Sequence, residues 1–110
     1  MFASTPEPPY VAVIFSARRT PDDEPGYGAM AEAMEHLAGE QPGYLGIESA
    51  RRRDGFGITV SYWATEADAR AWKHVGEHLG AQLLGRARWY EHYVVRVATV
   101  TRAYDGPGTG

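Results

Sequence analysis

The sequence of 110 residues contains no cysteine and no asparagine. Without cysteine the chain forms no disulfide bond, offers no thiolate nucleophile and builds no Cys-based zinc site. Its first residues, MFASTPEPPY, lack the basic and apolar regions of a secretory signal. No apolar run reaches the ~20 residues that a membrane-spanning helix requires. We therefore expect a cytoplasmic protein with no membrane partner.

Acidic residues outnumber lysine and arginine by 14 to 11, and the net charge is −3. A nucleic-acid-binding domain usually shows a basic stripe and a high pI. The one dense basic cluster is Arg51–Arg53, which stands beside an expected turn, and we interpret it as a solvated strand end. No nucleic-acid partner is expected.

The length suits one domain. Residues 1–9 are rich in proline and short of apolar anchors, so we expect a flexible N-terminal arm. We expect residues 106–110 to form a flexible C-terminal tail. The folded domain is then 10–105.

Four segments have the β-branched and aromatic composition of strands. They are 10–18, 44–53, 58–63 and a stretch within 89–104. Asp54-Gly55 predicts a tight hairpin between the second and third, because glycine tolerates positive φ.

Two helices are expected between these strands. Tyr27, Met30, Met34 and Leu37 recur at helical spacing. A second helix is expected to begin at Thr65, with Asp68 completing a capping-box-like start, and to continue to about residue 88, a break near 73–76 being left open. The order is β-α-β-β-α-β. It predicts an α+β, ferredoxin-like fold with a four-stranded antiparallel sheet and both helices on one face.

The first and last strands are apolar on both faces, although helices can cover only one face of the sheet. The second face would include Tyr10, Ala12, Ile14, Val94, Ala98 and Val100. An identical sheet is the simplest cover, since two-fold pairing is the commonest oligomer symmetry. We therefore predict a homodimer with sheets packed face to face.

Trp72, His74 and His78 form the most suggestive group for chemistry. Histidine ordinarily titrates near neutral pH and can move a proton, and tryptophan can wall an aromatic ligand. The two histidines are four residues apart, but no H-E-x-x-H pattern or third ligand accompanies them, so no metal site is expected. A solvated His74 and a boundary His78 bonded to backbone are the structural alternatives.

Further aromatic residues could line a cleft between sheet and helices. They are Tyr62, Trp63, Trp89 and Tyr90, with plain core packing as the alternative. Arg96, on the final strand, could pair with an acid of a dimer partner or hold a negatively charged substrate group.

Four segments resemble the antibiotic biosynthesis monooxygenase domain family of dimeric α+β barrels. They are PGYLGIES, DGFGITVSYW, AWKHVGEH and RWYEHYVVRVATVTRAY, and the similarity extends from Tyr10 to Tyr104. The resemblance implies a homodimer that binds a small molecule and oxidises a small aromatic or enolisable compound with O2, without metal or flavin. On this interpretation His78, Trp72 and Arg96 are catalytic, and Tyr62, Trp63, His74, Trp89 and Tyr90 bind substrate.

Two alternatives stay open. One is a non-catalytic dimeric barrel that binds a small metabolite or partner. The other, less favoured, is a haem-binding or haem-degrading protein. The well-understood monooxygenases of this superfamily use an asparagine and a tryptophan, and the haem-degrading branch adds an axial histidine. This chain offers no asparagine.

Overall fold

The computed structural model describes residues 2–21, 24–82 and 89–107. Its elements are β1 (Tyr10–Arg19), α1 (Glu24–Gly39), β2 (Tyr44–Arg51), β3 (Phe56–Trp63), α2 (Glu66–Gln82) and β4 (Tyr90–Val100). The order β-α-β-β-α-β confirms the predicted α+β, ferredoxin-like fold. No helix in the described ranges is both long and apolar enough to cross a membrane.

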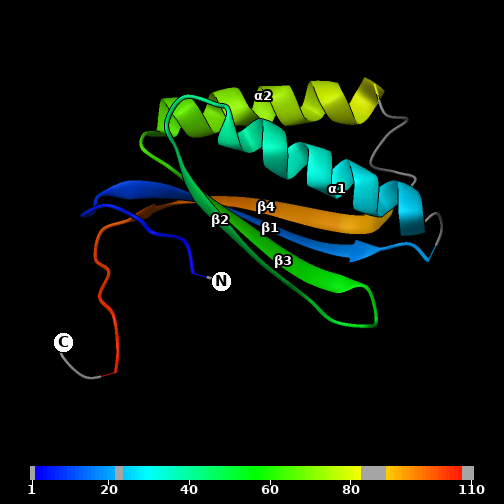
Figure 1. The fold of residues 1–110 in the computed structure, drawn as a ribbon, viewed down its shortest axis with the longest axis horizontal. Helices are drawn as coiled ribbons and strands as arrows, with labels where there is room; N and C mark the ends of the chain where they lie inside the picture. Colours follow the sequence, from blue (N-terminus) through cyan, green and yellow to red (C-terminus); the bar gives the residue numbers. More distant parts are fainter. Residues whose placement is uncertain (1, 22–23, 83–88, 108–110) are drawn as a thin grey trace.

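The four strands form one antiparallel sheet in the order β2-β3-β1-β4. Both helices lie on the same face of this sheet (Figure 1). In the register, Val13 stands opposite Ser61 of β3 and Val97 of β4. Because side chains alternate between faces, these three residues point toward the helices and their sequence neighbours point away. The predicted two faces of β1 are confirmed.

The core is small and centred on Trp63, which is fully buried. Val11, Ala38 and Ala69 are buried around it. Trp72 of α2 stacks on Trp63 with ring centroids 5.6 Å apart. The core therefore holds α2 against the two central strands of the sheet, β3 and β1.

Helix α2 begins where the capping signal predicted. The backbone N–H of Asp68 donates to Thr65 Oγ1 at 3.1 Å, which satisfies one of the unpaired donors of the first turn. The helix continues without a break through 73–76 to Gln82. Its expected extension to residue 88 lies outside the described residues.

The β2–β3 hairpin also follows its sequence signal. Gly55 has φ of +95°, a conformation that L side chains rarely adopt. The preceding Asp54 accepts the backbone N–H of Phe56 at 3.1 Å.

The sheet face turned away from the helices, here called the outer face, combines covered and exposed apolar residues. Tyr10 and Ala12 are buried, whereas Ile58 is 40% exposed. Tyr62 donates to Glu48 at 2.7 Å, a hydrogen bond that lowers the pKa of Glu48. Burial, and then this bond, raise the pKa of Tyr62 to about 12.

The segment before β1 contacts this face. The backbone N–H of Ala3 donates to Glu48 at 2.9 Å, and the Thr5 hydroxyl donates to the Tyr10 hydroxyl at 3.1 Å. The arm and tail boundaries stay predictions.

Candidate functional site

A cavity of about 590 Å³ lies between the helices and the sheet. Val13 and Phe15 of β1 and Ile47 of β2 contribute its floor, and Met30 and Met34 of α1 contribute one wall. The volume is typical of small-molecule sites, which are concave and mainly apolar. The apolar stripe of α1 therefore faces the sheet without filling the space beneath it.

Helix α2 contributes a charged rim. Glu66, Arg70, Lys73 and Glu77 line the cavity from one side of this helix. Arg70 pairs with Glu66 at 3.1 Å, and Lys73 lies 3.9 Å from Glu77. These side chains are mostly exposed, so the rim separates the apolar interior from solvent.

Four of the eight sequence-predicted site residues line this cavity. They are Trp72, His74, Trp89 and Tyr90. His74 is exposed and therefore stands at the mouth of the cavity.

The other four predicted residues lie elsewhere. Trp63 is enclosed in the core, where its indole N–H donates to Ser61 at 2.9 Å. Tyr62 and Arg96 lie on the outer face, Arg96 opposite Ile14. His78 is exposed and is not among the described residues that line the cavity.

A second hollow of about 230 Å³ continues one end of the cavity. The two share six lining residues: Phe15, Tyr27, Ser49, Arg51, Thr59 and Tyr90. We call this part the arginine end of the cavity, because Arg19 and Arg51 line it.

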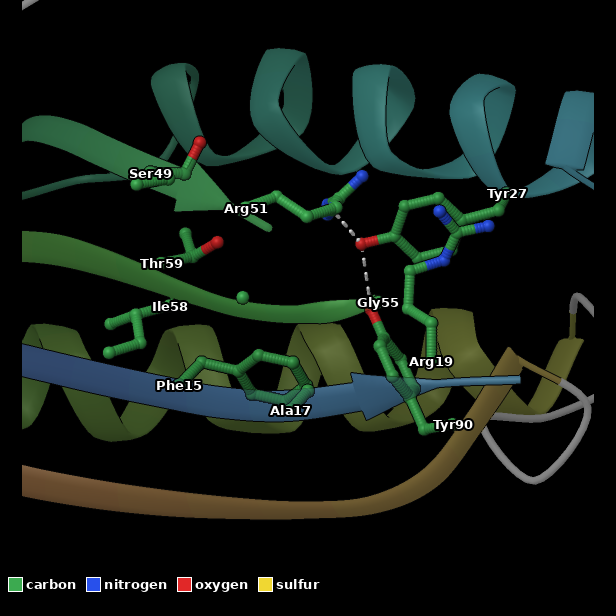
Figure 2. Close-up of a pocket in the computed structure, with 12 residues that line it drawn as sticks. Phe15, Ala17, Arg19, Tyr27, Ser49, Arg51, Gly55, Ile58, Thr59 and Tyr90 are labelled. Atoms are coloured by element: carbon green, nitrogen blue, oxygen red, sulfur yellow. Dashed lines mark hydrogen bonds between the residues drawn. The ribbon is translucent and has the colours of Figure 1, made fainter. Parts of the chain in front are cut away.

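Tyr27 of α1 is the centre of the arginine end (Figure 2). Its hydroxyl oxygen accepts Arg51 Nη2 at 2.6 Å and the Tyr90 hydroxyl at 3.4 Å. The Arg19 guanidinium lies over the Tyr27 ring, 3.5 Å from its centroid, and that of Arg51 lies at 4.7 Å. Such cation–π contacts hold the ring in place.

Burial and the hydrogen bond to Tyr27 raise the pKa of the Tyr90 hydroxyl above its ordinary value. Tyr90 is therefore protonated at neutral pH and serves as a donor to Tyr27. Next to it in the chain, the buried Trp89 indole N–H finds no acceptor within the described residues.

Tyr27, Arg19 and Arg51 were absent from the predicted site. The alternation of side chains along each strand could have indicated that both arginines face the helices. Arg19 has the same parity as Val13 and Phe15, which face the helices, and Arg51 has the same parity as Ile47. Arg51 is exposed at the end of β2, as predicted for a solvated strand end, and its guanidinium also donates to the Tyr27 hydroxyl.

Together these features describe a ferredoxin-like domain with a ligand-sized cavity beneath its helices. A family model described as antibiotic biosynthesis monooxygenase matches residues 11–82. The chain therefore belongs to this family, to which the sequence analysis found four of its segments similar.

The chain is also similar to individual proteins, one in sequence and two in fold. The chain is 54% identical over 100 residues to the uncharacterized protein YqjZ of Bacillus subtilis, covering 91% of this chain and 87% of YqjZ. The fold is similar to that of SnoaB, a cofactor-independent oxygenase from Streptomyces nogalater (TM-score 0.67, 15% identity, 92% of this chain and 100% of SnoaB). It is also similar to NE2512 of Nitrosomonas europaea, a protein of unknown function (TM-score 0.70, 14% identity, 91% and 97% coverage).

Proposed function

We propose that this protein is a cofactor-independent monooxygenase that oxidises a small aromatic or enolisable compound with O2. The observation that carries the proposal is the cavity of about 590 Å³, which is walled by aromatic and aliphatic side chains and bordered by a histidine. Membership of the family and the fold shared with SnoaB support the same chemistry.

The proposed reaction converts an activated methylene of the substrate to a carbonyl. A base removes one proton, and the resulting carbanion or enolate reduces O2. One oxygen atom becomes the new carbonyl, and the other leaves as water with the two hydrogens. The substrate supplies all four electrons, so no further reductant is needed. The protein supplies shape, a base and groups that stabilise negative charge.

His74 is the residue that we propose as the base, because it lines the cavity whereas His78 does not. Trp72 and Trp89 would bound the aromatic part of the substrate. The catalytic roles of His78 and Arg96 stay predictions, and the histidine pair allows a direct comparison because both residues lie on α2.

The test is oxygen uptake with 1,8-dihydroxy-9-anthrone, together with the absorbance of the quinone product. We expect uptake above the uncatalysed rate, a loss of about 100-fold in His74→Ala, as is usual for a general base, and little change in His78→Ala. If oxygen uptake is lost only in His78→Ala, the base is His78, as predicted from the sequence.

The same experiments separate the alternative functions. A ligand that stabilises the protein without any oxygen uptake would favour the non-catalytic alternative. A sharp Soret band on hemin titration that His74→Ala abolishes would favour haem binding.

We also propose that the protein is a homodimer with the outer faces in contact. Ile58 on this face is 40% exposed, and Val60, Val94 and Val100 are only partly buried. A twin sheet would cover these residues, and ~800 Å² per partner is enough for a stable contact. The cavity lies on the opposite face of the sheet and stays open in such a dimer.

A further inference from the structure

We propose that the arginine end of the cavity is a subsite for a carboxylate, so that the ligand of this protein is an aromatic acid. The inference deepens the proposed function, because it names the class of compound that the same cavity would take. The subsite concerns only the binding of the ligand, however, so it can be tested without any catalytic turnover.

The first observation is the state of the Arg51 guanidinium. Its hydrogen-bond acceptor is the Tyr27 hydroxyl at 2.6 Å, not a carboxylate. No carboxylate of the described residues lies within ion-pair distance of it. A guanidinium has five N–H donors in a planar fork, and a carboxylate can accept two of them in parallel. The bond to Tyr27 leaves enough donors for that geometry.

The second observation is that the Tyr27 oxygen accepts hydrogen bonds from two neighbours. The phenol oxygen accepts one hydrogen bond from Arg51 and another from Tyr90. A hydroxyl has two acceptor positions and one donor. With both acceptor positions occupied, Tyr27 has only its own O–H to offer, and an oxyanion beside Arg51 would accept it.

The third observation is the charge of the residues that line the arginine end. None of the described residues that line the arginine end is acidic, while two are arginines. The glutamates of the α2 rim, Glu66 and Glu77, line only the larger part of the cavity. The adjoining apolar volume could therefore hold the rings of a ligand whose carboxylate reaches Arg51 and Tyr27.

A matched pair of probes tests the subsite. Binding of 2-naphthoate and of 2-naphthamide is measured by isothermal titration calorimetry to the full chain. We expect the acid to bind more tightly. Arg51→Gln should weaken the acid about tenfold or more, as expected for a charge-assisted hydrogen bond, and should leave the amide unchanged. Tyr27→Phe should weaken the acid about fivefold through loss of the O–H donor.

Arg53→Gln is the control, because it removes the same charge from a residue of the same arginine run that does not line the cavity. It should leave both affinities within about twofold. Equal affinities for acid and amide, or equal effects of the Arg51 and Arg53 substitutions, would overturn the subsite. So would failure of benzoate, 2-naphthoate and anthracene-2-carboxylate all to bind below millimolar concentration.

The proposed oxidation and the proposed carboxylate subsite can be refuted independently of each other. Oxygen uptake with the neutral anthrone, combined with no preference for acids, would remove the subsite and keep the oxidation. Arg51-dependent binding of acids without uptake of oxygen from any of them would keep the subsite and remove the oxidation.

Discussion

Two stacked indoles show how differently neighbouring residues can serve one site. Trp63 and Trp72 lie 5.6 Å apart between ring centroids. Trp63 is fully buried, donates to Ser61 and meets Tyr44 edge-on, whereas Trp72 also borders the cavity. Trp63 therefore supports the wall from behind, and Trp72 presents that wall to a ligand.

The first residue-scale prediction concerns Trp63. Trp63→Phe would leave space in the core and leave Ser61 without the indole N–H, so we expect the free energy of unfolding to fall by about 1–3 kcal/mol. Urea denaturation followed by circular dichroism measures this change. Trp72→Phe, at a partly exposed ring, should cost less stability and alter ligand affinity more. The reverse order of the two stabilities would contradict the structural role given to Trp63.

At the residue scale, four of the eight residues named from the sequence line the cavity, and the roles of all eight stay predictions. Trp72, His74, Trp89 and Tyr90 line the cavity, but strand parity alone would have placed Tyr62 and Arg96 on the outer face. His74 and His78 could not be ranked from the sequence, because the exact rotation of α2 over the sheet depends on how Trp72 packs against Trp63. The Arg51–Tyr27 contact joins residues far apart in the chain, and no local pattern indicates it.

At the scale of the elements, the β2–β3 hairpin carries a local network of charged hydrogen bonds around Asp54. Arg52 donates to the Asp54 carboxylate through Nε at 3.2 Å and through Nη2, and Phe56 N–H donates to the same group. These bonds, the Arg52 bond first, lower the pKa of Asp54 from 3.8 to about 2. Turn and capping residues encode such short-range structure, which explains why the hairpin and the start of α2 were predicted closely.

A pH prediction belongs to this hairpin. Because the pKa of Asp54 is lower in the folded state, its contribution to stability is fully present above pH 3.8 and is lost as pH falls through about 2. An NMR titration of the Asp54 carboxyl carbon should give a midpoint near the lower value. Arg52→Gln should move the midpoint up toward 3.8, and Arg53→Gln should leave it in place. An Asp54 midpoint that is already ordinary in the wild-type chain would contradict the hydrogen bonds described.

At the scale of the whole molecule, the fold followed from the sequence, whereas the sequence left open whether a cleft or plain core packing lies between sheet and helices. Alternation and helical spacing specify which faces meet, so the order of elements and the sheet with helices on one side were predictable. The volume between α1 and the sheet depends on how closely the helices approach, which the small core around Trp63 and Ala69 sets at one end only. Apolar residues such as Met34 look the same in sequence whether they fill a core or line a cavity.

The last prediction concerns assembly, for which a twin sheet is the proposed cover of the outer face. Ile58→Glu would place a charge in that contact, and we expect the dissociation constant to rise about 30-fold or more, the equivalent of ~2 kcal/mol. Val97→Glu is a matched control, because Val97 is 55% exposed and lies on the helix-facing side of the same sheet. Sedimentation velocity at micromolar concentration should show a dimer for the wild-type chain and for Val97→Glu, and a larger monomer fraction for Ile58→Glu. A folded wild-type species of 12.1 kDa across this range would refute the dimer, and the partly buried valines and exposed isoleucine of the outer face would then need another cover.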